Sequence, residues 1–585
     1  MDKKKINTNA NLIWSTADSL DGTYKPHEYG LVILPLVVIK RFDCILLPTH
    51  QAVLDKLATT TLKGEILDGI LKKAAGHNFY NTSRFTFDTL LDDADHIREN
   101  LIDYLDGFSE DVKDIIKNYK FTEQIDRMTD PDHNILFGVL NRFKAINLGL
   151  YDKKTNPNGV DNIDMGYIFE EIIRRFSESY NEDAGQHYTP REVIRLMVDL
   201  LLSEDNQLLS GDSKIKTIYD PACGTGGMLS VAQEYLEDLN SQAVLKSYGQ
   251  ELNDETYAIA KSDILIKGQE STNIRKGNTL SDDKFQGAHF DYIISNPPFG
   301  RDWKDFRKVI EDEMKLGFAG RFPHGKPDVS DSQTLFLQHS LSKMKEPADG
   351  GSKIAIIHNG SPLFSGDVGN GVNNVRKYLF ENDLLEAIIQ LPNDIFYNTG
   401  ITVYIWVITN HKPALKKGKV QLIDASSHYE KLRKNIGKKR VEISQEQIKE
   451  IVHLYSEFSP SEYSKIFDNE DFGYTKITIQ QPLLDEHGKP VFKKGKMVPD
   501  TSKSDTENVP LKMDIASYFK SEVLPYVHKD AWFDYKEGDD VGYEIPFTRH
   551  FYKFIPPRDS NEIFKEIKEL EAQEALLMKE LFGND

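Results

Sequence analysis

The stretch Asp291-Tyr292-Ile293-Ile294-Ser295-Asn296-Pro297-Pro298-Phe299 determines how the centre of this 585-residue chain is interpreted. Its first half, through Ser295, has the apolar, β-branched composition of a buried strand. Its second half places an amide, two prolines and an aromatic ring directly after that strand. Proline stiffens the backbone and offers a carbonyl without a donor N–H, so the stretch predicts a strand end with pre-positioned hydrogen-bond acceptors.

A glycine-rich turn lies upstream, at Asp220-Pro221-Ala222-Cys223-Gly224-Thr225-Gly226-Gly227. Glycines let the backbone turn sharply and approach a ligand, and the N–H groups of the helix predicted after Gly227 favour a negative group. Dinucleotide enzymes use similar turns, although the spacing here differs from G-x-G-x-x-G. We predict a nucleotide-like cofactor there, with Cys223 as a packing residue.

An acidic residue, Glu251, closes the next strand candidate, Ser247-Tyr248-Gly249-Gln250. A carboxylate at that place can accept both hydroxyls of a ribose. It follows Asp220 by more than the ~20 residues usual in dinucleotide folds, because a helix over 228–239 and a loop intervene. The alternative is a solvated acid at a strand end.

The residues Asn296, Pro297 and Phe299 suit the methylation of an aromatic amine. Such an amine is a weak nucleophile, and two acceptors on its hydrogens, the Asn296 side-chain carbonyl and the Pro297 backbone carbonyl, would free its lone pair. Phe299 could stack on an extracted base. Because the donor would be a sulfonium, no metal is required, and positioning with electrostatics would provide the catalysis. A purely structural turn is the alternative.

Alternation of strands and helices predicts an α/β fold, a Rossmann-like S-adenosylmethionine-dependent methyltransferase core with a mostly parallel sheet covered on both faces. The expected strands are 217–219, 247–250, 290–295, 353–358, 385–391 and 402–408. Both motifs follow strands, where ligands bind in such sheets. We expect four regions: a helical N-terminal domain at 1–165, the catalytic domain at 166–415, a mixed extension at 416–558 and a C-terminal amphipathic helix at 559–585.

Several segments carry further expectations. The apolar run 31–39 is too short for the ~20 residues of a membrane span and predicts a core helix. Thr189 is predicted as the N-cap of a helix with Pro190 at its first position. Polar residues in 459–510 predict irregular or inserted surface structure. The helix at 559–585 needs a partner for its apolar stripe, either its own domain or a second helix.

Composition limits the cellular setting and the mode of substrate binding. Two cysteines and a polar, charged N-terminus predict a cytoplasmic protein without a disulfide framework. The net charge of −20 is unusual for a protein that binds DNA unaided, so another subunit would supply most of the contacts to DNA. The basic run at 431–440 is either a local binding face or a solvated surface.

The motifs together resemble the gamma-class adenine-N6 DNA methyltransferases: Gln186-His187-Tyr188-Thr189-Pro190-Arg191, then the turn at 220–227, then 296–299. Further stretches, including Leu12-Ile13-Trp14, 382–389, 396–401, 423–426 and 541–549, are similar to the modification subunit of type I restriction-modification systems. The resemblance covers nearly the whole chain.

That resemblance implies a site-specific adenine-N6 methyltransferase that flips its target base in double-stranded DNA. It implies two copies of this chain on one DNA specificity subunit, joined by a restriction subunit for cleavage. It assigns catalysis to Asn296, Pro297 and Phe299. It assigns S-adenosyl-L-methionine to Gln186, His187, Tyr188, Thr189, Pro190, Arg191, Asp220, Gly224, Thr225, Gly226, Gly227, Glu251 and Asn278.

One position departs from the family pattern. Asn278, in Gly277-Asn278-Thr279-Leu280, stands where many relatives carry aspartate. Its carbonyl oxygen can still accept a hydrogen bond from the cofactor's adenine amine, but without a charge.

Three other functions are compatible with parts of the pattern. The same tetrapeptide can serve a glutamine side-chain amide on a protein substrate. A methyltransferase fold that has lost activity could act as a scaffold, although Asn296, Phe299 and Glu251 are intact. An NAD-dependent dehydrogenase is disfavoured by the lack of G-x-G-x-x-G and of a hydride-transfer site.

Overall fold

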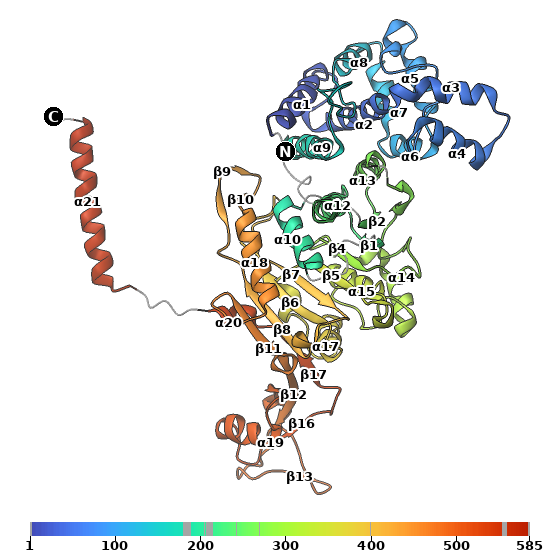
Figure 1. The fold of residues 1–585 in the computed structure, drawn as a ribbon. Helices are drawn as coiled ribbons and strands as arrows, with labels where there is room; N and C mark the ends of the chain where they lie inside the picture. The colour runs from blue at the N-terminus through green and yellow to red at the C-terminus, as the bar shows by residue number, and fades with distance from the viewer. Residues whose placement is uncertain are drawn as a thin grey trace. The chain divides into compact units, whose positions relative to one another are not determined.

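The centre of the molecule is a nine-stranded sheet with strand order β11-β8-β6-β7-β5-β4-β1-β2-β3. The computed structural model describes residues 3–179, 189–203, 205, 215–240, 243–267, 269–397, 399–552 and 558–582 (Figure 1). Strands β7 and β11 run antiparallel to their neighbours, and the other pairs are parallel. The bounds of the strands are β1 Ile215–Asp220, β2 Val244–Glu251, β3 Ile274–Lys276, β4 Tyr292–Ser295, β5 Lys353–Asn359, β6 Leu385–Gln390, β7 Val403–Thr409, β8 Lys419–Asp424 and β11 Ser464–Asp468.

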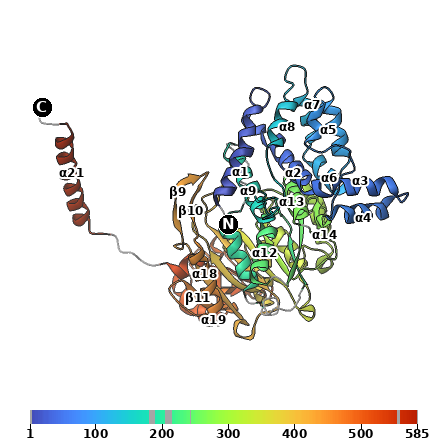
Figure 2. The same ribbon diagram turned by 45° about the horizontal axis from the view of Figure 1, so that its top comes forward.

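Helices cover both faces of this sheet. Apolar side chains of α10, α12 and α18 join one set of strand residues in a single buried cluster, and α15 and α17 pack on the other side (Figures 1 and 2). The bounds are α10 Arg191–Leu202, α12 Gly227–Leu239, α13 Asp254–Ile266, α14 Arg307–Met314, α15 Gln333–Ser342, α16 Ser361–Phe364, α17 Gly371–Glu381 and α18 Gln445–Glu457. The predicted α/β core with a mostly parallel sheet is confirmed.

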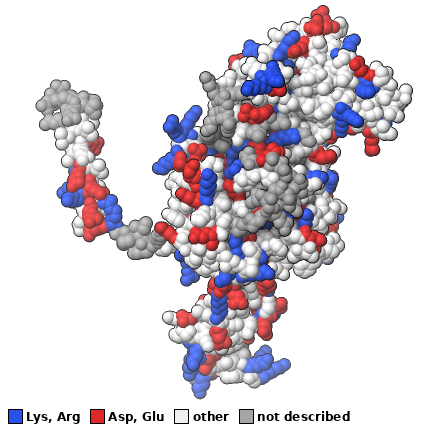
Figure 3. All heavy atoms as spheres, in the orientation of Figure 1, with Lys and Arg blue, Asp and Glu red and all other residues white. Residues whose placement is uncertain are grey.

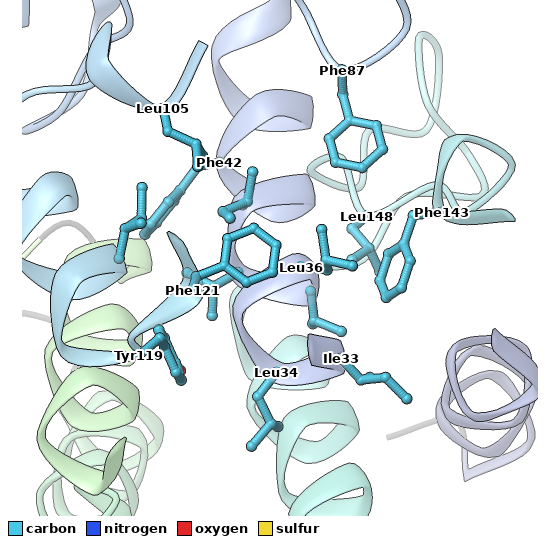
Figure 4. Close-up of a cluster of buried hydrophobic side chains, with 14 of the residues drawn as sticks. Ile33, Leu34, Leu36, Phe42, Phe87, Leu105, Tyr119, Phe121, Phe143 and Leu148 are labelled. Carbon is cyan, nitrogen blue, oxygen red and sulfur yellow. The ribbon is translucent and has the colours of Figure 1, made fainter. Parts of the chain in front are cut away.

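Residues 3–179 are mainly helical, and the predicted helical N-terminal domain is confirmed. The helices are α1 Lys3–Ser15, α2 Gly30–Leu46, α3 His50–Thr59, α4 Gly64–Ala75, α5 Ile97–Asp106, α6 Glu110–Asn118, α7 Phe121–Met128, α8 Leu136–Lys144 and α9 Asn162–Ser179. The run at 31–39 lies in α2, which is buried almost throughout and contains Pro35. Ile33, Leu34 and Leu36 of α2 belong to a buried apolar cluster that also contains Phe87, Phe121 and Phe143 from the surrounding segments (Figure 4).

Helix α13 links the helical region to the sheet because both of its sides are apolar. Tyr257, Ala260 and Ile264 belong to the cluster that α10, α12 and α18 form with the sheet, which is called the cluster under the sheet below. Ala258 and Ile259 belong to the buried cluster of the N-terminal helices. The Tyr257 hydroxyl and the Lys261 ammonium each donate to a carboxylate oxygen of Asp114 on α6, at 2.7 Å. The helical region is therefore held beside strands β2 and β3, where part of the candidate site lies.

The prediction of irregular or inserted surface structure over 459–510 is wrong for the residues that form strands β11, β12 and β15, whereas 481–504 contains mostly turns and irregular structure. The segment 459–510 supplies β11, and β12 Gly473–Gln480 pairs with β15 Asp505–Pro510, β16 Trp532–Asp534 and β17 Val541–Tyr543 in a second, smaller sheet. Apolar residues of β12 and β15 pack on α19 Ile515–Tyr518 and the turns after it. Residues of β12 alternate between buried and half-buried positions, which is typical of a strand, but the surrounding clusters of Pro, Gly, Asp and Lys favoured an interpretation as loop. The short hairpin of β13 Phe492–Lys493 and β14 Lys496–Met497 completes the region.

The last residues form a separate compact unit, Pro546–Asp585. It contains α20 Phe547–Phe551 and α21 Ser560–Phe582, and the Asn561 N–H donates to the Asp559 carboxylate at 2.6 Å. Seven large apolar side chains of α21 are exposed: Ile563, Phe564, Ile567, Leu570, Leu576, Leu577 and Met578.

The described residues contain neither a candidate membrane-spanning helix nor a candidate metal cluster. No described helix is both long enough and apolar enough to cross a bilayer. Among those same residues, no cluster of three or more His, Cys, Asp or Glu side chains could hold a metal ion.

A buried ion pair stabilises the edge of the sheet that lies opposite the carboxyl ends of β1, β2, β3 and β4. The Lys416 ammonium lies 2.7 Å from a Glu386 carboxylate oxygen, both side chains are at most 3% exposed, and the Tyr455 hydroxyl donates to the same oxygen. We expect Glu386→Ala to lower the free energy of unfolding by about 3–5 kcal/mol, because it leaves a buried ammonium without its carboxylate. Glu381→Ala, which removes an exposed partner of Lys377, should cost about 0–1 kcal/mol. Thermal unfolding followed by circular dichroism compares the two variants, and equal melting temperatures would contradict this role.

Candidate functional site

Four loops meet at the carboxyl edge of the sheet because β1, β2, β3 and β4 are parallel and adjacent. Together with the start of α10 they line a pocket of about 540 Å³. Of the residues predicted to form the site, the pocket lining contains Thr189, Arg191, Asp220, Gly224, Thr225, Gly227, Glu251, Asn278 and Asn296. Pro190, Gly226, Pro297 and Phe299 are not part of the lining. Gln186, His187 and Tyr188 lie outside the described residues.

The glycine turn after β1 is shaped by the close approach of α13 and β2. Gly226 is the N-cap of α12 with φ of +81°, and a Cβ there would lie 3.2 Å from the Ala260 Cβ. The buried Cys223 side chain fills the space above Gly249, where an added Cβ would lie 2.9 Å from its sulfur. Burial also raises the pKa of the Cys223 thiol, which keeps it protonated and agrees with a packing role.

Glu251 joins the loops after β1 and β2. One carboxylate oxygen accepts from the Gly224 N–H at 2.8 Å, and the other accepts from the Asn253 N–H at 2.8 Å. These two bonds fix the plane of the carboxylate at the rim of the pocket. Each oxygen retains a second lone pair for a ligand donor.

Asp220 joins the ends of β1 and β4. One of its oxygens accepts from the Ala222 N–H at 2.9 Å and from the Ser295 hydroxyl at 3.0 Å. The residue is 2% exposed, and burial, with the charge of Glu251 nearby, raises the pKa of its carboxyl to about 7. An acidic group that titrates near neutrality therefore lies in the pocket wall.

Asn278 is engaged with its own loop. Its side-chain oxygen accepts from the Leu280 N–H at 2.9 Å, and the Thr279 hydroxyl donates to the Pro221 carbonyl at 2.5 Å. These bonds attach the loop after β3 to the loop after β1.

Asn296 presents an unused acceptor. Its amide nitrogen donates to the Thr189 hydroxyl at 3.0 Å, which orients the amide. Its carbonyl oxygen is buried and has no hydrogen-bond partner among the described residues. Because a buried polar atom without a partner costs free energy, this oxygen is a candidate for contact with a ligand that carries an N–H or O–H donor.

The prediction that Thr189 caps α10 is wrong, since the N-cap is Pro190 and no side chain caps the helix. The N–H groups of Val193 and Ile194 bond to the Pro190 carbonyl instead. The Thr189 hydroxyl is thereby available to Asn296. Arg191 is likewise engaged, because it donates to Glu234 at 2.6 Å and stacks on the Tyr167 ring at 3.8 Å.

The other residues of the tetrapeptide differ in their exposure. Pro297 is buried, and Pro298 is exposed and lines the pocket. Phe299 is half-buried and packs against the apolar cluster under the sheet.

An apolar wall of the pocket was not predicted. Trp303, Phe306, Leu280 and Phe336 form it, and the Trp303 indole N–H donates to the Asp328 carbonyl at 3.0 Å. Trp303 follows the segment Asn296–Phe299 by only a few residues. Tryptophan is scarce in the chain, and this scarcity was the one feature of the sequence that could have drawn attention to Trp303.

Arg321, also not predicted, holds the loop after β3. Its guanidinium donates to the carbonyls of Thr279 and Leu280 at 2.6 and 2.9 Å and to both carboxylate oxygens of Glu313. It also donates to Nδ1 of the buried His339 at 3.1 Å, and burial lowers the pKa of that imidazole well below its usual value. The neutral ring can then bond the Tyr219 hydroxyl through Nε2, at 3.0 Å.

The pocket thus combines three kinds of surface. Carboxylates of Asp220 and Glu251 can accept hydrogen bonds from a cation or from hydroxyls, the aromatic wall can contact a flat ring, and the Asn296 oxygen can accept from an amine. This set suits a cationic, ring-containing ligand beside a substrate with an N–H donor.

Comparisons with known proteins fit this arrangement. The family described as "N-6 DNA Methylase" matches residues 161–478, more than half of the chain, and that described as "HsdM N-terminal domain" matches residues 9–143. The type I restriction enzyme MjaIX methylase subunit of Methanocaldococcus jannaschii is 26% identical over 486 residues, covering 80% of each chain. The EcoEI methylase subunit of Escherichia coli is 31% identical over 261 residues, covering 43% of this chain and 47% of that one.

A solved structure has the same fold. The type I restriction-modification methyltransferase subunit from Streptococcus thermophilus superposes with a TM-score of 0.61 at 20% identity, covering 80% of this chain and 96% of that one. At this identity the likeness concerns the fold alone.

Proposed function

This chain belongs to the N-6 DNA methylase family, and from that premise we propose that it is the modification subunit of a type I restriction-modification system. In this role it transfers a methyl group from S-adenosyl-L-methionine to N6 of an adenine flipped out of duplex DNA, at sites chosen by a separate specificity subunit. The family predicted from the sequence motifs is confirmed. The observation that carries the catalytic proposal is the buried, unpartnered carbonyl oxygen of Asn296 in the pocket.

The pocket has the properties required to hold S-adenosylmethionine. Its volume of about 540 Å³ lies within the range of small-molecule sites, ~300–1,000 Å³. When bound, this cofactor supplies an electrophilic methyl group on a positively charged sulfur. We assign the ribose hydroxyls to Glu251, the cationic amino acid part to Asp220 and the adenine ring to the wall formed by Leu280 and Trp303.

The other cofactor contacts follow from the lining. The turn at Gly224–Gly227 would admit the cofactor close to the backbone, and Asn278 would contact its adenine. Because the Asn278 oxygen already accepts the Leu280 N–H at 2.9 Å and the Ser281 N–H at 3.4 Å, its amide nitrogen is the group left for that contact. Arg191 would act by holding the wall of the pocket through Glu234.

Asn296 would act on the target adenine. Its carbonyl oxygen would accept one hydrogen of the N6 amine and the Pro297 carbonyl the other, which makes the nitrogen lone pair available to the methyl group. The Thr189 hydroxyl holds the Asn296 amide in the orientation that this contact needs. Phe299 packs on the sheet core in this structure, so its stacking on the base requires its ring to turn toward the pocket.

The regions of the chain would divide the remaining tasks. We propose residues 1–165 as a helical domain docked through α13 and 166–415 as the catalytic domain. Residues 416–558 would be an extension that adds β8 and β11 to the nine-stranded sheet and also contains β9–β10, α18 and the smaller sheet. We assign residues 559–585 to subunit contact. Two such subunits on one specificity subunit, with a restriction subunit for cleavage, would form the assembly in the cytoplasm.

Methylation of adenine in duplex DNA is the direct test. The complex of this chain with its specificity subunit, given S-adenosylmethionine and genomic DNA from cells lacking the system, should form N6-methyladenine. Asn296→Ala should lower the rate at least about 100-fold, because it removes the acceptor oxygen, while cofactor affinity by calorimetry changes only a few-fold.

The exposed Asn508→Ala is the matched control and should keep full activity. Methyl groups found only on protein would reject the DNA substrate. Loss of cofactor binding in Asn296→Ala would instead place Asn296 in the cofactor site.

The pH dependence of cofactor affinity should report Asp220. Its pKa of about 7 exceeds that of an unfolded aspartate, so its burial favours folding only while it is protonated, and that contribution is lost as pH rises toward 7. A cationic ligand binds the ionised form, so affinity for S-adenosylmethionine should rise between pH 6 and 8, with release of a proton. Calorimetry in two buffers of different ionisation enthalpy measures that release.

Asp220→Asn retains an oxygen for the Ala222 N–H and the Ser295 hydroxyl, so the turn should survive. Its cofactor affinity should be weaker and independent of pH over this range. An unchanged slope in this variant would assign the titration to another group.

Helix α21 is the segment that we assign to the specificity subunit. Ile563, Ile567, Leu570 and Leu577 are exposed and share one side of the helix at 100° per residue. Deleting residues 559–585, or introducing Leu570→Asp, should release the chain from a tagged specificity subunit in a pull-down. Lys565→Gln, on the opposite side of α21, should not. Retention of the deletion variant would show that the stripe is not the contact.

A further inference from the structure

The basic run at 431–440 forms an exposed antiparallel hairpin. It consists of β9 Glu430–Ile436 and β10 Lys439–Glu442, joined by a tight turn at Gly437 and Lys438, and is called the basic hairpin below. Five of its cationic side chains are exposed: Lys431, Arg433, Lys434, Lys438 and Arg440. None of the five has a carboxylate partner among the described residues.

The charge of the basic hairpin contrasts with that of the whole molecule. The chain carries 92 acidic and 72 basic residues, and on the face that Figure 3 shows, Lys and Arg are interspersed with Asp and Glu. Blue side chains project from the side of the molecule on which Figure 1 draws β9 and β10. A protein with a net charge of −20 repels polyanions at long range, so five adjacent unpaired cations create a local site of opposite sign.

The basic hairpin is rigidly attached to the core. The Lys438 N–H donates to the Tyr397 carbonyl at 2.8 Å, and the Arg440 N–H donates to the Asp394 carbonyl at 2.9 Å. Gly437 has φ of +58°, and a Cβ there would lie 2.6 Å from the Tyr397 carbonyl oxygen, so only glycine allows this approach. The side chain of Val441 belongs to the apolar cluster under the sheet.

The topology of the sheet places the basic hairpin at the same edge as the pocket. Strands β6 and β8 run parallel to each other, and β6 has the direction of β5, β4 and β1 because β7 is antiparallel to both β5 and β6. The loop after β6 that receives the hairpin turn, and the start of β9 after β8, therefore leave the sheet at the carboxyl edge that carries Asn296.

A buried contact connects the basic hairpin to the wall of the pocket itself. Its sixth cation, Lys439, has a side chain only 4% exposed that pairs with Glu192 and donates to the Ile395 carbonyl at 3.2 Å. Glu192 directly follows Arg191, which lines the pocket, and Thr189, which orients Asn296, lies three positions earlier. The exposed cations thus stand beside the pocket in a fixed position.

We propose that the basic hairpin binds the phosphate backbone of duplex DNA next to the target base. This inference rests on the proposed function and adds a contact surface on this chain to the one on the specificity subunit. Exposed Lys and Arg without internal partners can neutralise phosphates without breaking an existing ion pair. The contact would position the duplex so that the flipped adenine reaches Asn296, and it would carry no sequence preference.

The test replaces the five exposed cations with glutamine, K431Q/R433Q/K434Q/K438Q/R440Q, in the complex with the specificity subunit. Fluorescence anisotropy measures the affinity for a labelled random-sequence duplex over a series of NaCl concentrations. At ~0.9 per phosphate contact, loss of two to four contacts should make the plot of log affinity against log salt less steep by about 2–4. Affinity near 0.15 M salt should fall at least about tenfold, while calorimetric affinity for S-adenosylmethionine should stay within about twofold.

A second basic hairpin offers a matched control. Lys489, Lys493, Lys494 and Lys496 are exposed around β13 and β14 in the smaller sheet region, outside the nine-stranded sheet. K489Q/K493Q/K494Q/K496Q removes a similar charge and should leave the salt dependence unchanged. An equal loss of DNA affinity and salt dependence in both variants would show that net charge alone causes the effect, and it would overturn the proposal.

The two proposals fail in different ways. If the unaltered complex methylates DNA and the five-fold variant keeps its affinity and salt slope, the basic hairpin does not contact DNA, and the methylase function stands. If the unaltered complex binds S-adenosylmethionine but never methylates DNA, both are overturned. Should the five-fold variant misfold, R433Q and R440Q separately should each make the slope less steep by about 0.9, and no change in either overturns the proposal.

Discussion

The site depends on one constraint, the parallel direction of β1, β2, β3 and β4, which brings four strand ends to a single edge of the sheet. Hydrogen bonds then connect those ends in pairs. Glu251 accepts from Gly224, Asp220 accepts from Ser295, and Thr279 donates to Pro221. Each loop is held by a neighbouring loop, so the pocket is a property of the whole edge and not of any one motif.

The polar groups of the pocket differ in how much of their bonding capacity is already used. Both oxygens of Glu251 and the oxygen of Asn278 accept backbone N–H groups, so their positions are fixed before any ligand arrives. The Asn296 oxygen accepts nothing from the described residues, although Thr189 fixes its orientation. Preorganised acceptors lower the cost of reorganisation on binding, which is how such a site can accelerate methyl transfer.

The distribution of charge agrees with the proposed division of tasks between this chain and a specificity subunit. The chain as a whole is acidic, whereas the basic hairpin presents five exposed cations at the carboxyl edge of the sheet. If the proposed specificity subunit recognises the sequence, this chain needs only enough positive charge to position a DNA backbone. Arg321 and Lys439, by contrast, form ion pairs within the protein and hold the loops that shape the pocket.

Local sequence determined the elements of the catalytic core, because apolar strands followed by Gly- and Pro-containing turns are specified by residues close in the chain. The end of β2 at Glu251, the start of α12 at Gly227 and the acceptor-rich segment after β4 could all be predicted in this way. The strands in 459–510 were missed, because clusters of Pro, Gly, Asp and Lys surround the alternating pattern of β12. Only the tertiary structure decided that Thr189 orients Asn296, that Arg321 holds the loop after β3 and that the basic hairpin stands beside the pocket. Those contacts join residues far apart in the chain, and their geometry follows from strand order and packing, which no local pattern encodes.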